Sequence, residues 1–163
     1  MFDLPCYTKP DVQEEFRKKI QKICDELGSS NENTEIVKIL APLTDNPNAP
    51  EKDGYTPIYW AASEGHTKIV KILAPLTDNP NAPDKNGDTP IYEAARIGHT
   101  EIVKFLAPLT DNPNTSDNHG RTPIYWAAQN GHTEIVKILA PLTDKPNAPD
   151  ENRYTPIHMA ACN

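Results

Sequence analysis

The sequence predicts an all-α solenoid in which short helix-turn-helix units are stacked side by side. Three consecutive segments, 49–81, 82–114 and 115–147, carry nearly the same 33 residues. Aligned without gaps, the first matches the second at 25 positions and the third matches it at 23. A period of this length is typical of stacked repeats. Each unit can form only helices of fewer than about 12 residues, which are unstable alone in water, so their stability must come from neighbouring units.

Each unit begins with a tight turn that leads into a first helix. In 82–114 the turn contains Asn86-Gly87, where glycine supplies the positive φ of a sharp reversal. Thr89 is expected to cap the helix through its hydroxyl. Pro90 suits the first helical position, because the amide that it lacks would be unpaired there in any residue. The first helix is therefore predicted to begin at Pro90.

The first helix carries a narrow apolar stripe formed by Ile91, Ala94 and Ala95. The paired alanines allow a neighbouring helix to approach to about 8–10 Å between axes. Gly98 is expected to end the helix as its C-terminal cap. These features predict that first helices pack closely on one another.

The second helix of the unit is predicted to open at Thr100 as N-cap, with Glu101 interacting favourably with the positive end of the helix dipole. Apolar residues at helical spacing indicate its buried side. They are Ile102, Val103, Phe105, Leu106 and Leu109.

The turn, helix, turn, helix unit resembles the ankyrin repeat over about residues 28–163. The residues that carry the resemblance recur three times, and in 82–114 they are Asp84, Gly87, Thr89-Pro90-Ile91, Ala94-Ala95, Gly98-His99, Ile102-Val103, Leu106 and Asn114. The resemblance implies a curved stack of helix pairs. It also implies β-turn fingers that project at one edge, and a concave surface formed by the fingers and the first helices.

The chain departs from the family pattern in two ways. Where the family usually has His after Thr-Pro-Leu, this chain has Tyr59, Tyr92 and Tyr125. The Thr–His hydrogen bond typical of the family is therefore expected only at Thr155 and His158. A proline also falls in the last turn of each second helix, at Pro42, Pro75, Pro108 and Pro141. Because proline lacks an amide and clashes with the preceding turn, this helix is expected to end early or kink outward.

The two ends of the chain differ from the full units 49–81, 82–114 and 115–147. In 1–48, apolar residues at helical spacing predict one amphipathic helix over 11–27, followed by a partial repeat that begins at its second helix. A plain N-terminal cap is the leading interpretation of the long helix, and docking of a partner helix is the alternative. Residues 148–163 supply only the finger and first helix of a further unit.

The uncovered face of that last helix, formed by Ile157, Met159 and Ala160, is expected either to cost stability or to recruit a partner, which would be an identical chain or the rest of a longer protein. The favoured interpretation is that the chain is a fragment of a longer repeat array. Self-association through the unfinished C-terminal repeat is a further hypothesis.

Composition and charge narrow the function classes. The net charge of -7, without a basic run, disfavours both nucleic acid and anionic membrane as partners. No apolar run approaches the roughly 18 residues of a membrane span, and residues 1–5 lack the features of a signal peptide, so a cytoplasmic or nuclear location is expected. The 3 cysteines form no C-x-x-C pair and are expected to be free thiols.

The sequence offers no motif for catalysis. It has no nucleophile with a paired base, no phosphate-binding glycine-rich loop and no metal motif, so neither enzymatic activity nor a cofactor is expected. His66, His99 and His132 recur at the turn between the two helices, 33 residues apart. Hydrogen bonds that brace this loop explain them better than a metal site does.

Differences among the repeats indicate where a partner would bind. Between 49–81 and 82–114 eight positions differ, and six of them lie in the finger or the first helix. Stacking places equivalent positions in rows. The first row is Tyr55, Asp88, Arg121 and Tyr154, the second is Trp60, Glu93, Trp126 and Met159, and the third is Ser63, Arg96 and Gln129. Aromatic residues and arginines are typical of interface hot spots. His119, at a finger tip, is a further candidate.

The alternative for the tryptophans is that they merely pack against a neighbouring first helix. Because Glu93 occupies the same row, that position is expected to be partly open to solvent, which favours a binding role. Two functions follow as hypotheses. The leading one is a protein–protein interaction module that uses the fingers and the concave first-helix face, and the alternative is a structural spacer or assembly element that makes contacts through its open C-terminal end.

Overall fold

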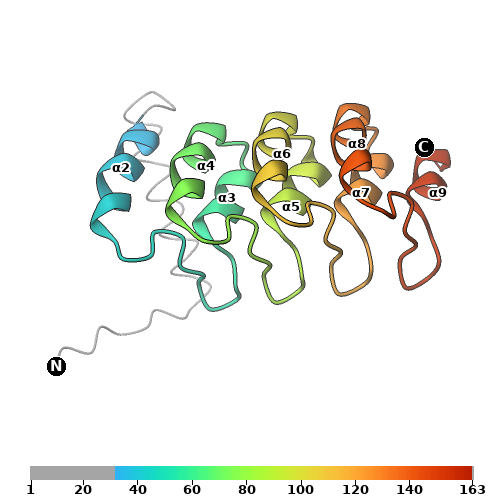
Figure 1. The fold of residues 1–163 in the computed structure, drawn as a ribbon, viewed down its shortest axis with the longest axis horizontal. Helices are drawn as coiled ribbons and strands as arrows, with labels where there is room; N and C mark the ends of the chain where they lie inside the picture. The colour runs from blue at the N-terminus through green and yellow to red at the C-terminus, as the bar shows by residue number, and fades with distance from the viewer. Residues whose placement is uncertain (1–31, 163) are drawn as a thin grey trace. The chain divides into compact units, whose positions relative to one another are not determined.

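The computed structural model describes residues 32–162, drawn in colour in Figure 1. The chain divides into two compact units, Met1–Ile39 and Leu40–Asn163. The helix predicted over 11–27 lies outside the described residues. α2 (Glu32–Leu40) begins in the first unit, where the sequence predicts entry into the second helix of a repeat. Throughout residues 32–162 the regular structure is helical, which confirms the all-α prediction.

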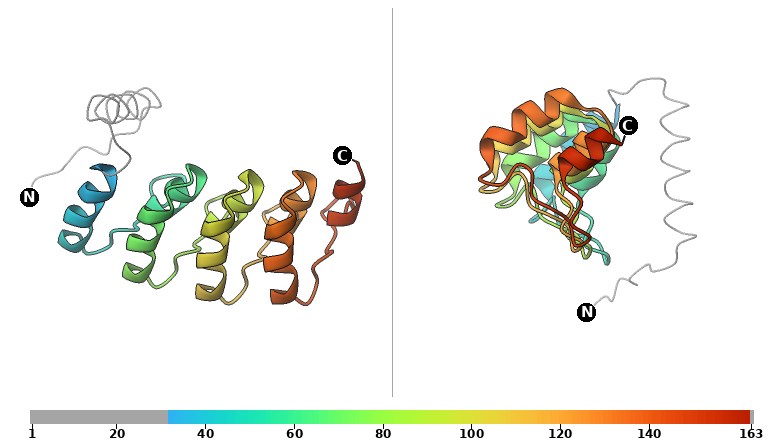
Figure 2. Two further views of the ribbon diagram at one scale, coloured as in Figure 1. Left: turned by 90° about the horizontal axis from the view of Figure 1, so that it is seen from above. Right: turned by 90° about the vertical axis from the view of Figure 1, so that its right-hand side faces the viewer.

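In the second unit, the helices come in pairs. The pairs are α3 (Pro57–Ser63) with α4 (Thr67–Leu73), α5 (Pro90–Ile97) with α6 (Thr100–Leu106), and α7 (Pro123–Gln129) with α8 (Thr133–Leu139), followed by α9 (Pro156–Ala161) alone. The first helices α3, α5, α7 and α9 contact one another in chain order, and so do the second helices α4, α6 and α8. Figure 2 shows these pairs following one another in a row. This is the predicted solenoid. None of the helices between residues 32 and 162 is long and apolar enough to span a bilayer.

Each first helix begins with the predicted cap. The Thr89 hydroxyl accepts a hydrogen bond from the Tyr92 amide at 3.1 Å, and Pro90 occupies the first turn. A second anchor was not predicted: Asn81 Oδ1 accepts from the Ile91 amide at 2.9 Å. The same bond recurs in the other repeats at 3.0–3.1 Å, from Ile58 to Asn48, from Ile124 to Asn114 and from Ile157 to Asn147. Each first helix is thus fixed to the loop that precedes its finger.

α9 keeps the Thr–His pair that the family resemblance implies. Thr155 Oγ1 lies 2.8 Å from His158 Nδ1, and each residue also bonds the backbone amide of the other, which completes a capping box. In the three full repeats a tyrosine ring occupies this position, and in two of them, at Tyr92 and Tyr125, its hydroxyl reaches a carboxylate of the next finger instead.

The second helix α6 begins at Thr100, but its predicted N-cap is wrong by one residue. His99, not Thr100, is the N-cap of α6, and its side chain makes no capping bond. Its Nε2 instead lies 3.1 Å from the Ser63 carbonyl oxygen of the preceding repeat. The ring braces two repeats, as predicted for these histidines.

Two glycines permit this close approach. A Cβ atom at Gly65 would lie 2.7 Å from Cε1 of His99, and one at Gly98 would lie 2.6 Å from Cε1 of His132. Gly98 also has a φ of 103°, a conformation that side chains rarely adopt. Within 4 Å of the corresponding Cβ at Gly131 there is no atom.

Each second helix ends early at its proline, as predicted. The α-helical part of α6 ends at Leu106, and Ala107–Leu109 continues as a 3-10 turn. The other second helices also continue as 3-10 turns, at Ala41–Leu43, Ala74–Leu76 and Ala140–Leu142. The prediction that Leu109 is buried is wrong, since 47% of its surface is exposed. The 3-10 turn has about 3.0 rather than 3.6 residues per turn, so it rotates Leu109 off the buried side.

The fingers are the turns that precede the first helices, and backbone hydrogen bonds tie each to the next. Amide nitrogens of Lys85, Asn118 and Glu151 donate to carbonyl oxygens of Asp53, Asn86 and His119 at 3.2, 2.9 and 2.9 Å. Within a finger, Asp84 Oδ1 accepts from the amides of Asn86 and Asp88, both at 2.8 Å. The fingers are therefore ordered parts of the scaffold.

Replacement of Ile91 by Ala should destabilise the fold by about 2–5 kcal/mol, because Ile91 is 0% exposed between first helices. The matched control is Ile157→Ala, which changes the same repeat position where 67% of the residue is exposed, and should stay within about 0.5 kcal/mol. Urea unfolding measures both. Equal losses would contradict the stacking described above.

Candidate functional site

The twelve residues predicted to contact a partner differ in how far they are open to solvent. Trp60, Arg96, His119 and Tyr154 are exposed, Glu93 is buried, and the half-buried residues are Tyr55, Ser63, Asp88, Arg121, Trp126, Gln129 and Met159. The structure brings eight of them into contact with another charged or aromatic side chain, as described below. Ser63 contributes its carbonyl to His99 instead.

Three aromatic rings gather at the first full repeat. The Tyr55 ring centroid lies 4.7 Å from that of Tyr59 and 5.2 Å from that of Trp60. The Tyr59 and Trp60 rings meet edge to face at 5.8 Å. Trp60 is 39% exposed, so this cluster presents an aromatic face to solvent.

Trp126, in the same row as Trp60, sits in a polar network. Its indole nitrogen donates to the Tyr92 hydroxyl, which in turn donates to Asp117 Oδ2 at 2.8 Å. Arg121 Nε also donates to Asp117 Oδ2, at 2.7 Å, and its guanidinium lies 5.1 Å above the Trp126 ring. Burial raises the pKa of the Asp117 carboxyl, but hydrogen bonds from Tyr92 and Arg121 outweigh it and hold that pKa below its usual value.

The expectation that Glu93 lies partly open to solvent is wrong. Glu93 is only 7% exposed. Arg96 Nε donates to Glu93 Oε2 at 2.9 Å, and a second guanidinium nitrogen bonds the other oxygen. A bidentate arginine satisfies both oxygens, which lets the carboxylate be buried.

Asp88 has an unusual environment. Its Oδ1 is buried and accepts no hydrogen bond. Burial, and then the nearby carboxylates Asp84, Asp117 and Glu93, together raise the pKa of the Asp88 carboxyl to about 6, while Arg121 opposes them. The middle repeat thus holds a carboxyl that keeps its proton to a higher pH than an ordinary aspartate does.

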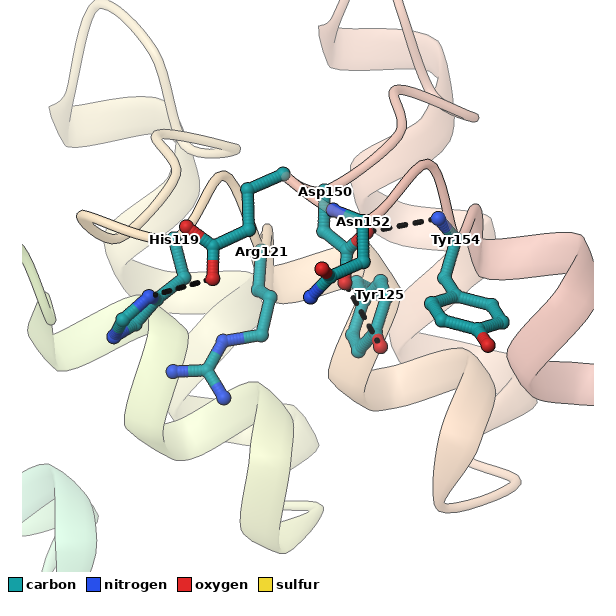
Figure 3. Close-up of a pocket in the computed structure, with 7 residues that line it drawn as sticks. His119, Arg121, Tyr125, Asp150, Asn152 and Tyr154 are labelled. Carbon is teal, nitrogen blue, oxygen red and sulfur yellow. Dashed lines mark hydrogen bonds and ion pairs between the residues drawn. The ribbon is translucent and has the colours of Figure 1, made fainter.

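A pocket with a volume of about 400 Å³ lies between the last two fingers, as Figure 3 shows. It is lined by His119, Arg121, Tyr125, Asp150, Glu151, Asn152 and Tyr154. His119 Nδ1 lies 3.1 Å from Glu151 Oε1, and the Tyr125 hydroxyl donates to Asp150 Oδ2 at 3.5 Å.

The sequence predicted three of these residues and missed four. His119, Arg121 and Tyr154 were candidates, whereas Tyr125, Asp150, Glu151 and Asn152 were not. A signal was present for the first two: a first-helix tyrosine is followed 25 residues later by a finger aspartate three times in succession, Tyr59 with Asp84, Tyr92 with Asp117 and Tyr125 with Asp150.

The arrangement suits noncovalent recognition. Aromatic faces, paired charges and a pocket lie along the fingers and the first helices. Among residues 32–162 no three His, Cys, Asp or Glu side chains lie close enough together to hold a metal ion.

Asp88→Asn should stabilise the fold at pH 7.5 and change it little at pH 4. The ordinary pKa of 3.8 is raised to about 6 in the folded chain, so stability falls as the pH rises through this window. At pH 7.5 the ionised Asp88 carboxylate lowers the free energy of unfolding by at most about 3 kcal/mol, and the uncharged asparagine removes this cost. Urea unfolding at both pH values measures the difference, with exposed Asp111→Asn as the control for loss of one charge. A variant no more stable than the parent at pH 7.5 would refute this account.

Comparison with known proteins bears on the whole described stack. A family model described as ankyrin repeats, three copies, matches residues 27–117, 76–150 and 109–163. A search of curated proteins finds no match. The matched residues span 27–163, and the described part of that span folds into stacked helix pairs with fingers. The chain therefore belongs to the ankyrin-repeat family.

Proposed function

We propose that this protein is an interaction module that binds a protein partner through its fingers and the first-helix face. Ankyrin repeats serve in general as protein–protein interaction modules. The observation that carries the proposal is the pattern of variation within the chain. Six of the eight differences between 49–81 and 82–114 fall on this face, while the second helices and the buried stripe hardly change.

Exposed aromatic side chains mark the two ends of this face. Trp60 is 39% exposed and Tyr154 is 51% exposed, although each lies against a neighbouring ring. Large, rigid side chains bury much area on binding and lose little entropy. Because the fingers are already tied to one another by backbone bonds, binding does not require a loop to become ordered.

The charge of this face indicates the kind of protein that fits it. The fingers and first helices of residues 49–162 carry nine carboxylates and five cationic side chains. The carboxylates are Glu51, Asp53, Glu64, Asp84, Asp88, Glu93, Asp117, Asp150 and Glu151, and the cations are Lys52, Lys85, Arg96, Arg121 and Arg153. A basic partner surface would be complementary. This proposal includes a cytoplasmic or nuclear location. It also includes binding without catalysis, to a partner that is neither nucleic acid nor membrane.

A second candidate is assembly through α9. Ile157 is 67% exposed, whereas the equivalent Ile91 and Ile124 are 0% and 2% exposed. Exposure of a side chain that is core in the other repeats favours a contact there. Under this alternative a second copy of the chain packs on the α9 face, and the array serves as a spacer or assembly element.

Trp60→Ala should remove most of the proteins that the chain captures from a cell lysate, because it removes the exposed part of the aromatic cluster. Leu76→Ala is the matched control, since Leu76 is 45% exposed on a 3-10 turn outside the fingers and first helices. Helicity should be equal in both variants. Capture that depends equally on Leu76, or on neither residue, would count against the first-helix face.

Light scattering after gel filtration tests the second candidate. Over a concentration series the chain should pass from monomer to dimer, and Ile157→Glu should stay monomeric because a charge cannot be buried in that contact. A monomer at every concentration would refute assembly through α9.

A further inference from the structure

Two junctions between adjacent fingers repeat one arrangement of side chains. A first-helix tyrosine of one repeat donates to the finger aspartate of the next, Tyr92 to Asp117 and Tyr125 to Asp150. The variable finger position of the next repeat lies four residues after that aspartate. At the three described junctions this variable position is Asp88, Arg121 or Tyr154. The chemistry of each junction therefore depends on the residue at that one position.

The middle junction is filled by an arginine from the chain itself. Arg121 donates to Asp117 Oδ2 at 2.7 Å, beside the Tyr92 hydroxyl at 2.8 Å from the same oxygen. The guanidinium also lies 5.1 Å above the Trp126 ring. The Asp117 carboxylate and the Trp126 ring thus hold one guanidinium, and the Tyr92 hydroxyl donates to the same carboxylate oxygen.

The last junction has the same carboxylate and tyrosine without the arginine. Asp150 is only 8% exposed, and its Oδ1 accepts from the Asn152 and Tyr154 amides at 2.9 and 2.8 Å. Within residues 32–162, its Oδ2 accepts one hydrogen bond, the 3.5 Å bond from Tyr125. Tyr154 takes the position of Arg121, but its ring turns toward His158 at 6.3 Å. The pocket of about 400 Å³ in Figure 3 occupies this junction.

We propose that this pocket binds the guanidinium of an arginine side chain from the protein partner. The inference rests on the proposed interaction function and names what one part of that surface recognises. The incoming group would bond Asp150 Oδ2, as Arg121 bonds Asp117, and would lie against the rings of Tyr125 and Tyr154. A planar, weakly hydrated guanidinium fits a carboxylate between aromatic faces better than a lysine ammonium does.

The other charges that face the pocket do not oppose this assignment. Arg121 is already paired with Asp117, and His119 is paired with Glu151 at 3.1 Å. Arg121 has its own carboxylate and Glu151 is held by His119, so the carboxylate left for an incoming cation is that of Asp150. The nearby Arg153 is exposed on the finger turn and does not line the pocket.

The test is an NMR titration of the full chain with N-acetyl-arginine amide. The amide signals of His119, Asn152 and Tyr154 should shift and saturate, in the millimolar range that one charge-assisted contact supports. N-acetyl-citrulline amide, which has the same shape without the charge, should bind at least about tenfold more weakly. Equal shifts with both compounds, or no saturation with the arginine compound, would overturn the proposal.

Two variants locate the binding. Tyr154→Arg places an arginine at the position of Arg121, so it should fill the junction and abolish the shifts. Asp150→Asn keeps the Oδ1 acceptor that holds the finger and should weaken binding at least about tenfold. Tyr154→Phe, which keeps the ring, should bind within about threefold of the parent. Binding by Tyr154→Arg at parental strength would refute the assignment.

Failure here is distinguishable from failure of the interaction function. Suppose that captured proteins are lost in Trp60→Ala but still bind Tyr154→Arg and Asp150→Asn. In that case the proposed interaction surface stands, and only the arginine pocket is overturned.

Discussion

The packing of each first helix on the next is the contact on which the rest of the structure depends. α3, α5 and α7 have 7, 8 and 7 residues, which is too short for stability in isolation. They persist because the buried isoleucines and paired alanines of one repeat meet those of its neighbours. The finger bonds and the histidine braces can form only after this stacking sets the distance between repeats.

The sequence was sufficient for the architecture because the determinants of the architecture are local and repeated. The Thr-Pro helix start, the Gly98 cap and the helix end at each proline follow from short-range chemistry and are found as predicted. Leu109 and His99 were misassigned for a different reason. The spacing of apolar residues in an α-helix cannot predict that the helix changes to 3-10 geometry before Leu109. The usual preference for threonine as N-cap cannot predict that His99 has a hydrogen-bond partner 36 residues away.

The candidate site was less predictable, because its properties arise from pairs of residues in different repeats. Glu93 looked like a solvent-facing residue until Arg96 was seen to occupy both its oxygens. Asp150 looked like an ordinary turn residue, and only the comparison of adjacent junctions distinguishes it from Asp117. Stacking of the repeats determines which side chain lies beside each charged group. That neighbour decides whether the charged group is exposed, paired, or able to accept a further hydrogen bond.

The variable finger position has a consequence for how such surfaces can change. Asp88, Arg121 and Tyr154 occupy equivalent places with different charge and shape, while the helix caps and the buried stripe around them stay constant. A single codon change in one repeat could therefore convert an acidic junction into a filled one or an open one without altering the caps and the apolar stripe that specify the repeat. The array can be treated as a set of independently adjustable recognition units, whose order along the chain sets the order of chemical groups that a partner must present.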